Sequence, residues 1–382
     1  MTSKQRFTAA AEHSETDRVP VGEHWVPHTL VEQIVGVERS HYNAWGYAQI
    51  AFWEGQRDEV VDQMKEHYVE FIRRTGLDMA TVELVPPKNW EFECPKRLGE
   101  GLWEDATGSK LQWYENVHDI MVVEEGTKEA PHEPHPEPDG SEWEFWDHVV
   151  KELGETHFIM AVGIPLYPHD YCRVHLGRSR FDSFQNLMYR IKEDPDSIAE
   201  AQVKQADSIY EGSKLARERG ADAMRIVFDY GCSTGPYCSP EDFRRAFLPG
   251  LKAHSDAVRR AGLISVLHVD GSVEPVIDQI AEGGPDIYQA VQGYEPMDEY
   301  KRAVGDDLAF WGNVDNDRLA RGTPEEIRSL SRWAIQNCKQ GGGFILGSAH
   351  DVLLPTPKEN FMAMVETAFE DQPQHLVSEK TQ

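Results

Sequence analysis

Short apolar runs alternate with longer amphipathic segments along most of the chain, most regularly after Phe158. This alternation predicts strands joined by helices, and therefore a mainly parallel sheet. Eight strands are predicted, at residues 19–25, 79–84, 158–165, 224–229, 264–270, 286–292, 308–314 and 343–350. Eight strands with intervening helices predict an α/β fold of the (β/α)₈ TIM barrel type. A doubly wound open sheet is the main alternative, but the chain has no GxGxxG or GxxxxGK[ST] phosphate turn.

Three predicted helices begin with sequences that suit a helix N-terminus. A serine or threonine is followed by proline and at least one acidic residue at 239–242, 323–326 and 356–359. The hydroxyl accepts a hydrogen bond from a free backbone N–H group, and proline and acidic side chains are favourable in the first turn. These signals predict helices after the fourth, seventh and eighth strands.

The regular pattern is interrupted between the second and third predicted strands. Residues 85–157 show no clear period and are predicted to form an irregular insertion, with two or three short antiparallel strands between 101 and 121. The run 123–141 is rich in Pro, Glu and His, which predicts a surface segment. Residues 1–370 are therefore expected to form a single barrel domain that carries this insertion, with 371–382 as a C-terminal tail.

Acidic residues outnumber basic ones, since 66 Asp and Glu stand against 38 Lys and Arg, for a formal net charge of −28. Such a surface repels phosphates and anionic headgroups, so neither a nucleic acid nor a membrane is an expected partner. The chain has no apolar run of about 18 residues and no recognisable signal peptide. Five scattered cysteines fit free thiols, and a cytoplasmic location is expected.

Most predicted strands end in polar or ionisable side chains. In a barrel of this kind, the C-terminal ends of the strands carry the chemistry. The residues at these ends are Glu23, His24, Glu83, Tyr167, His169, Asp229, His268, Asp270, Gln292, Asn313, Asp315, His350 and Asp351. Metal-binding and acid–base groups are more frequent among them than in ordinary loops, so this end of the barrel is the expected functional site.

Two histidines and one aspartate in this set form a candidate metal site. His268 and Asp270 are two residues apart in one strand, so their side chains point to the same face. With His350 at the end of the eighth strand, they offer a ligand set that suits a divalent metal. The His268–Asp270 spacing also fits a mutual hydrogen bond that fixes a loop, and the spacing alone leaves both interpretations open.

Asp229 ends the apolar strand 224–229. A carboxylate there is expected to be partly desolvated, which raises its pKa and suits acid–base catalysis. The alternative is that Asp229 caps the backbone of Gly231 or Ser233. Trp25 either lines an aromatic pocket or packs in the core.

Several motifs occur in the order of a known family. They are residues 6–10 (Arg-Phe-Thr-Ala-Ala), 17–21 (Asp-Arg-Val-Pro-Val), 228–229 (Phe-Asp), 239–243 (Ser-Pro-Glu-Asp-Phe), 268–271 (His-Val-Asp-Gly), 312–315 (Gly-Asn-Val-Asp), 322–325 (Gly-Thr-Pro-Glu), 342–344 (Gly-Gly-Phe) and 355–360 (Pro-Thr-Pro-Lys-Glu-Asn). Together they resemble the uroporphyrinogen decarboxylase superfamily, and within it the cobalamin-dependent methyltransferases. The resemblance spans most of the chain and implies a TIM barrel.

True uroporphyrinogen decarboxylases use no metal and hold carboxylate side groups with arginines near the first strand. Here that strand ends in Glu23, His24 and Trp25, and no arginine follows until Arg39. Guanidinium groups are the usual clamps for carboxylates, so the porphyrin reaction is disfavoured.

The methyltransferase branch binds zinc through a His-x-Cys pair at the fifth strand and a Cys at the eighth. These positions correspond to His268, Asp270 and His350, so both thiolates are replaced by other metal ligands. The resemblance implies a divalent metal, with zinc the first choice and iron or another first-row metal also compatible. A harder nitrogen and oxygen site disfavours a thiol substrate and suits polarisation of an ether or hydroxyl oxygen.

The resulting hypothesis is a methyltransferase of the O-demethylase type. It would demethylate a methoxylated small molecule, aromatic ones included, and pass the methyl group to cobalamin on a separate corrinoid protein. Asp229 or Glu23 would handle a proton or orient the substrate, and the expected substrate contacts are His24, Trp25, Tyr230, Gln292 and Asn313. A metal-dependent decarboxylase, or another lyase or hydrolase, acting on a small aromatic acid at the same site is the alternative. A non-catalytic binding protein is a third class, and the family resemblance also allows a homodimer.

Overall fold

The computed structural model describes residues 1–128, 139–163 and 177–371. The predicted C-terminal tail lies outside these residues apart from Asp371, as does the centre of the Pro-, Glu- and His-rich run. Tyr167 and His169, which the sequence places at the end of the third strand, also lie outside them.

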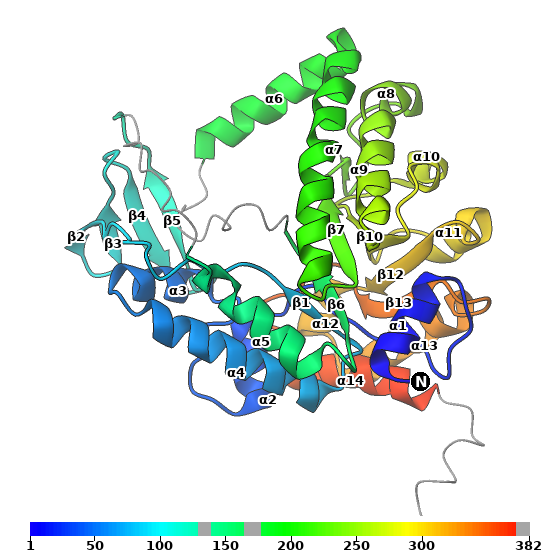
Figure 1. The fold of residues 1–382 in the computed structure, drawn as a ribbon, viewed down its shortest axis with the longest axis horizontal. Helices are drawn as coiled ribbons and strands as arrows, with labels where there is room; N and C mark the ends of the chain where they lie inside the picture. Colours follow the sequence, from blue (N-terminus) through cyan, green and yellow to red (C-terminus); the bar gives the residue numbers. More distant parts are fainter. Residues whose placement is uncertain (129–138, 164–176, 372–382) are drawn as a thin grey trace, which may run out of the picture.

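A curled parallel sheet forms the centre of the molecule (Figure 1). Its strands, in spatial order, are β1 (Met79–Val82), β6 (Phe158–Ala161), β7 (Ala223–Val227), β10 (Ile264–His268), β11 (Ile287–Val291), β12 (Ala309–Val314) and β13 (Phe344–Ser348). All neighbours pair in parallel. Each strand begins within one residue of its predicted start, so seven of the eight predicted strands are confirmed.

The first predicted strand, 19–25, is reduced to one bridge, in which Val21 pairs in parallel with Leu346 of β13. Leu346 donates its backbone N–H to the carbonyl of Pro20 (2.9 Å), and Gly22 donates to the carbonyl of Leu346 (3.0 Å). On the other side, the N–H of Asp78 donates to the carbonyl of Val21 (2.8 Å). Proline has no N–H, which limits the pairing, yet this segment bonds to both edges of the sheet and completes the barrel.

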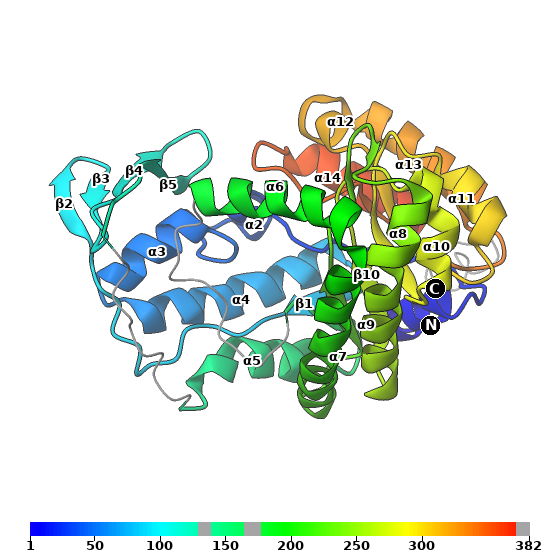
Figure 2. The ribbon, with the colours of Figure 1, turned by 90° about the horizontal axis from the view of Figure 1, so that it is seen from above.

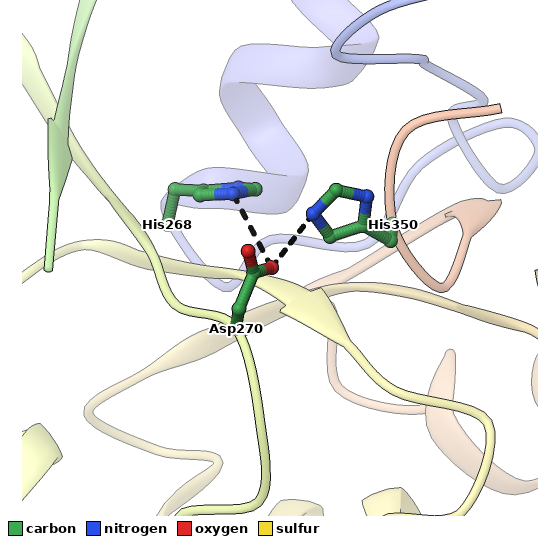
Figure 3. A group of neighbouring side chains, drawn as sticks. All are labelled: His268, Asp270 and His350. Atoms are coloured by element: carbon green, nitrogen blue, oxygen red, sulfur yellow. Dashed lines mark ion pairs between the residues drawn. The ribbon is translucent and has the colours of Figure 1, made fainter. Parts of the chain in front are cut away.

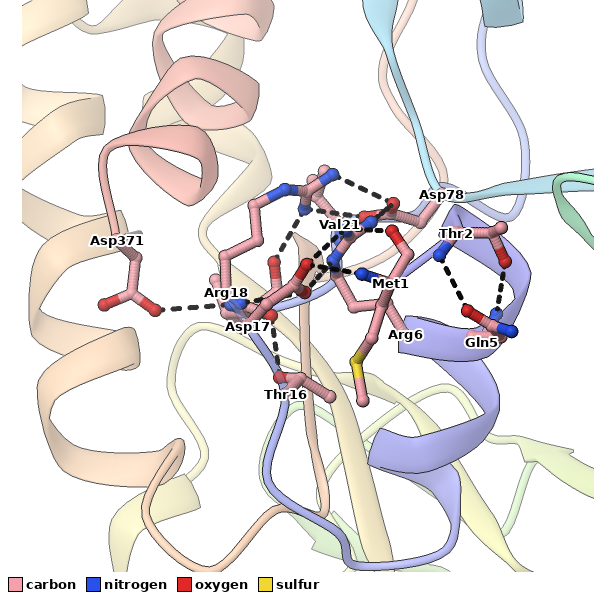
Figure 4. Close-up of polar contacts among 11 residues, drawn as sticks. Met1, Thr2, Gln5, Arg6, Thr16, Asp17, Arg18, Val21, Asp78 and Asp371 are labelled. Atoms are coloured by element: carbon pink, nitrogen blue, oxygen red, sulfur yellow. Dashed lines mark hydrogen bonds and ion pairs between the residues drawn. The ribbon is translucent and has the colours of Figure 1, made fainter. Parts of the chain in front are cut away.

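A buried carboxylate holds the closing segment in place (Figure 4). The fully buried Asp78 accepts the N–H of Val21 (2.9 Å) and a two-pronged contact from Arg18 (2.7 and 2.9 Å). Arg6 of α1 (Ser3–Ala11) reaches the same carboxylate at 2.7 Å and is also paired with the partly exposed Asp17. One carboxylate therefore joins α1, the closing segment and the start of β1.

The barrel interior is plugged at the N-terminal end of the strands. Phe7 of α1 stacks on Phe158 of β6 (4.4 Å between ring centroids) and meets the edge of Trp311 of β12. The N–H of Lys4 bonds to the carbonyl of Thr156, just before β6. Inward-facing residues of the strands pack with these rings and form a hydrophobic core inside the barrel. Because α1 fills this end, the opposite end remains for chemistry.

Helices surround the sheet (Figure 2). Those of the C-terminal half are α7 (Pro195–Glu218), α8 (Pro240–Ala246), α9 (Leu248–Arg260), α10 (Ile277–Glu282), α11 (Met297–Val304), α12 (Asn316–Arg321), α13 (Pro324–Cys338) and α14 (Lys358–Glu370). Those of the N-terminal half, with α6, are α2 (His28–Val35), α3 (Trp45–Trp53), α4 (Arg57–Thr75), α5 (Glu144–Leu153) and α6 (Gly177–Glu193). Within the described ranges, no helix has the length and apolar character needed to cross a membrane.

Two of the three predicted helix starts are confirmed. The hydroxyl of Ser239 caps α8 by accepting the N–H of Asp242, and Thr323 forms a capping box with Glu326 at α13. The third is displaced, because α14 has Pro357 at its N-cap and the buried Thr356 makes no cap.

The insertion after β1 contains a four-stranded antiparallel sheet. Its strands are β2 (Lys96–Gly99), β3 (Leu102–Glu104), β4 (Lys110–Tyr114) and β5 (Asp119–Glu124), so the predicted antiparallel strands are confirmed and extended. A small core of its own includes Trp103, Leu111 and Ile120. The sheet lies beside α3, away from the barrel axis (Figures 1 and 2).

Candidate metal centre

His268, Asp270 and His350 come together at the C-terminal ends of β10 and β13 (Figure 3). One ligand atom from each lies within 4.8 Å of the other two. The nearer oxygen of Asp270, Oδ1, is 2.7 Å from Nε2 of His350 and 3.6 Å from Nε2 of His268. Gly271, at φ +91°, turns the chain tightly against the backbone of Gly231, where a side chain would not fit. The predicted convergence of the three side chains is therefore present in the structure.

Gln289 of β11 sets the tautomer of His268. Nδ1 of the imidazole is hydrogen-bonded to the amide oxygen of Gln289, so Nδ1 carries the proton. The lone pair of Nε2 is left on the side of Asp270. Burial, together with the charge of Arg225, lowers the pKa of His268, which keeps the ring neutral. A neutral imidazole whose other nitrogen is hydrogen-bonded is the usual form of a metal-binding histidine.

The Asp270 carboxylate fits a bound cation. Its Oδ1 is buried and lies 2.7 Å from Nε2 of His350, and both imidazoles face it (Figure 3). Burial opposes its charge, but the contact with His350 brings the pKa of Asp270 below its usual value. A carboxylate oxygen that faces two imidazole nitrogens presents three metal-binding atoms to one point. A divalent cation would satisfy all three groups, so the residues fit such a metal.

His24 belongs to a polar chain beside the centre rather than to its ligand set. Its Nδ1 donates to Asp351 (2.6 Å), and its Nε2 accepts from Arg225 of β7. Burial and the charge of Arg225 lower the pKa of His24 to about 3. Its ring lies 5.0 Å from that of His268 and stacks on Trp25 at 4.7 Å. Because both ring nitrogens are engaged within the chain, the predicted substrate contact of His24 is replaced by a positioning role.

Glu23 is enclosed rather than open to substrate. Its two oxygens accept the N–H (2.8 Å) and the hydroxyl (2.6 Å) of Ser348 at the end of β13. Burial raises the pKa of Glu23 to about 8 despite these hydrogen bonds. The same hydroxyl contacts the carbonyl of His350. Glu23 thus fixes the strand end that carries His350.

Asp229 lies at the mouth, but the expectation that it is desolvated is wrong, because the side chain is exposed. Its carboxylate accepts the backbone N–H of Asp270 (3.2 Å), which helps to place that ligand. The alternative, in which Asp229 accepts a backbone N–H group, is closer to the structure. The donor is Asp270 and not Gly231 or Ser233.

The other predicted substrate contacts divide into two groups. Asn313 and Gln292 brace neighbouring strand ends, since the amide of Asn313 donates to the carbonyl of Gln292 (3.1 Å). Tyr230 is buried against Phe243 and Phe247 of the outer helices. Its assignment to the substrate site is wrong, because its ring faces the core between β7 and α8.

Comparison with known proteins identifies the family. The family model described as uroporphyrinogen decarboxylase (URO-D) matches residues 143–370, more than half of the chain. The chain belongs to the uroporphyrinogen decarboxylase family.

Individual members of this family give weaker matches. The methylcobamide:CoM methyltransferase MtaA of Methanosarcina barkeri is 26% identical over 149 residues, which are 39% of this chain and 41% of that protein. A uroporphyrinogen decarboxylase of Crocosphaera subtropica is 27% identical over 176 residues, or 46% of this chain and 48% of that protein. The matched segments thus span less than half of these relatives. A solved methyltransferase from Methanosarcina mazei shares the fold, with a TM-score of 0.64, 18% identity and coverage of 97% and 99% of the two chains.

The sequence did not predict two polar residues beside the candidate metal centre of this family member. Gln289 and Arg225 lie within the strands instead of at their ends, and Gln289 interrupts the apolar run of β11. A polar residue at an inward-facing position of an otherwise apolar strand is the sequence feature that could have indicated them. Arg225 places a guanidinium beside the site from β7, although its Nη1 and Nη2 are engaged by His24 and by the carbonyl of Val162 (2.6 Å for Nη2).

Replacement of Gln289 by leucine is expected to weaken metal binding by this family member by about 10- to 100-fold, as loss of an outer hydrogen bond to a ligand does. The change removes the acceptor for Nδ1 of His268 and frees the ring to change tautomer. Competition with a chromophoric zinc chelator measures the affinity. Gln279→Leu, at a buried glutamine of α10 that bonds to the carbonyl of Pro240, is the matched control. Equal affinities of the two variants would contradict this role of Gln289.

Proposed function

We propose that this chain is a metal-dependent methyltransferase of the uroporphyrinogen decarboxylase family. In this proposal, His268, Asp270 and His350 hold a divalent metal, with zinc the first choice. The methyl group comes from a methoxylated small molecule, aromatic ones included, and passes to cobalamin on a corrinoid protein. The observation that carries the proposal is the convergence of both imidazoles on one oxygen of Asp270 at the open end of the barrel. The match to a methylcobamide:CoM methyltransferase supports methyl transfer.

The ligand types support an oxygen-bonded methyl group over a sulfur-bonded one. When bound to two imidazoles and a carboxylate, the cation supplies a Lewis acid toward an oxygen atom. The residues at the mouth suit an apolar ring. Val227 ends β7 opposite His268 and is half exposed, and Trp25 is partly exposed on the neighbouring side.

The reaction requires a proton as well as a methyl acceptor. The bond between the methyl carbon and oxygen breaks, the methyl group moves to cobalt, and the oxygen of the leaving group takes up a proton. The proposal gives the handling of this proton to Asp229, whose side chain is exposed at the mouth. Glu23 is enclosed by Ser348, so the proposal gives it a positioning role.

The test is methyl transfer with defined reactants. Zinc-loaded protein, 2-methoxyphenol or a related methoxylated aromatic, and cob(I)alamin are mixed without oxygen, and methylcobalamin is followed by its absorbance. The proposal expects methylcobalamin to form with the zinc-loaded protein and not with the metal-free protein or with His350→Ala. Absence of methyl transfer from every methoxylated compound tried would contradict it.

The second candidate is a metal-dependent decarboxylase or other lyase at the same centre. The match to a uroporphyrinogen decarboxylase supports decarboxylation as the reaction type, and the metal in this alternative rests on His268, Asp270 and His350 alone. Release of CO2 from a small aromatic acid by the zinc-loaded protein, without methyl transfer, would establish this alternative and overturn the first.

A further inference from the structure

The insertion sheet and α3 line a partly open cavity of about 410 Å³ that shares no residue with the candidate metal centre. Its walls come from the helix on one side and from residues 94–115 on the other. All of these residues precede the segment 143–370 that matches the family model. The cavity is therefore a feature that the family match does not account for. Its volume lies in the range of small-molecule sites.

Close packing fixes the two walls relative to each other. A side chain at Gly46 of α3 would lie 2.6 Å from the ring of Trp113 and from the carbonyl of His118, so the helix approaches the sheet more closely than any other residue would allow. Trp103 is buried in the small core of the sheet, together with Leu111. The cavity is thus held open by packed elements on both sides.

Four aromatic rings line the cavity as two tilted pairs. Tyr47 of α3 meets Trp113 of β4, with centroids 4.7 Å apart and planes at 51°. Trp53 of α3 meets Trp103 of β3 at 5.6 Å and 58°. Each pair has one ring from the helix and one from the sheet. Trp53 and Trp113 are partly exposed, so these two indoles are the rings that a ligand in the pocket can reach most directly.

The charges around these rings favour a cation. Glu54 and Glu115 both line the cavity and are exposed. Glu115 is fixed beside its ring, because it accepts the indole N–H of Trp113 (2.7 Å). Arg97 is the cationic residue of the lining, and its Nε donates to the carbonyl of Gly99 (3.2 Å). The lining has two carboxylates and one guanidinium, and Arg39 on the ring of Tyr47 adds a second cation beside it. These residues therefore carry no net positive charge, and in a chain of net charge −28 they disfavour an anionic ligand.

A cation already lies on one of these rings. The guanidinium carbon of Arg39 is 3.7 Å from the centroid of Tyr47. This contact shows that a ring of the cluster accepts a positive charge on its face. Aromatic faces combined with carboxylates are the usual surroundings of a bound quaternary ammonium group.

We propose that this aromatic cavity binds a quaternary ammonium compound. Its methyl groups contact the indole and phenol faces, and Glu54 and Glu115 balance its charge. The site is independent of the metal centre and goes beyond the proposed methyl transfer.

Isothermal titration of the full chain with choline tests the site, and 3,3-dimethyl-1-butanol is the neutral compound of the same shape. Choline is expected to bind saturably, and the neutral compound at least about tenfold more weakly, since only choline makes cation–π contacts. Equal binding of both compounds would show an apolar cavity and overturn the proposal. Absence of choline binding would overturn it as well.

Variants distinguish binding in this cavity from binding to the acidic surface in general and from binding at the candidate metal centre. Glu54→Gln and Trp53→Leu are expected to weaken choline binding. Glu100→Gln, at an exposed glutamate outside the cavity, and Trp333→Leu, at an exposed tryptophan of α13, are expected to leave it unchanged. His268→Ala is expected to retain it. Equal weakening by Glu54→Gln and Glu100→Gln, or loss of binding in His268→Ala, would contradict the assignment.

Discussion

Replacement of His268 by alanine is expected to abolish stoichiometric zinc binding and, with it, methyl transfer. The side chain is buried, its tautomer is fixed by Gln289, and its Nε2 faces Asp270. Loss of an outer hydrogen bond to a ligand already costs about 10- to 100-fold in metal affinity, so loss of the ligand itself costs more. Without the metal, Asp270 and His350 retain only their mutual contact. Zinc content after dialysis, measured by mass spectrometry, gives the result.

The control for this variant is His148→Ala, which removes a partly buried histidine from α5. Its zinc content is expected to equal that of the unmodified protein. The fold of both variants is checked by circular dichroism. A folded His268→Ala protein that retains full zinc content would show that the metal binds elsewhere.

Replacement of Asp78 by alanine is expected to lower the free energy of unfolding by about 3–5 kcal/mol, the cost of removing one partner from a buried ion pair. Arg18, itself buried, loses both contacts to the carboxylate, and Arg6 loses one. The N–H of Val21 also loses its acceptor. The change thus loosens the segment that closes the barrel. Urea denaturation followed by tryptophan fluorescence measures the effect.

Asp62→Ala is the matched control, because the exposed Asp62 pairs with the partly buried Lys65 at the surface of α4. Exposed pairs contribute about 0–1 kcal/mol, so little change is expected. A similar small effect for Asp78→Ala would show that the contacts in Figure 4 do not stabilise the barrel closure.

The barrel could be predicted because its strands are short apolar runs with clear boundaries. The exception is the first strand, where Pro20 interrupts the backbone pairing with β13. The side-chain pattern at 19–25 is typical of a strand. The pattern does not show which backbone N–H groups can form hydrogen bonds with a neighbouring strand. The closing role of this segment depends on Asp78, which is distant in sequence from Val21 and gives no local signal.

The metal-ligand set could be predicted because His268 and Asp270 lie two apart in one strand and His350 ends another. The spacing alone left a loop-fixing hydrogen bond as the alternative, and the convergence of His350 as well as His268 on the same oxygen of Asp270 favours the metal. The partners of these side chains could not be predicted. Gln289 reaches His268 from the neighbouring strand β11. Tyr230 packs on Phe243 of α8, which follows it in the chain. Both arrangements depend on tertiary contacts.

X-ray absorption at the zinc K edge of the zinc-loaded protein tests the central claim most directly. The structure predicts a first shell of nitrogen and oxygen atoms at about 2.0–2.2 Å, from the imidazoles of His268 and His350 and the carboxylate of Asp270. It predicts no sulfur ligand from the part of the chain that the structure describes, because no cysteine there belongs to this group of ligands. A sulfur shell at about 2.3 Å would contradict the account, since zinc would then bind at a cysteine outside the centre described here.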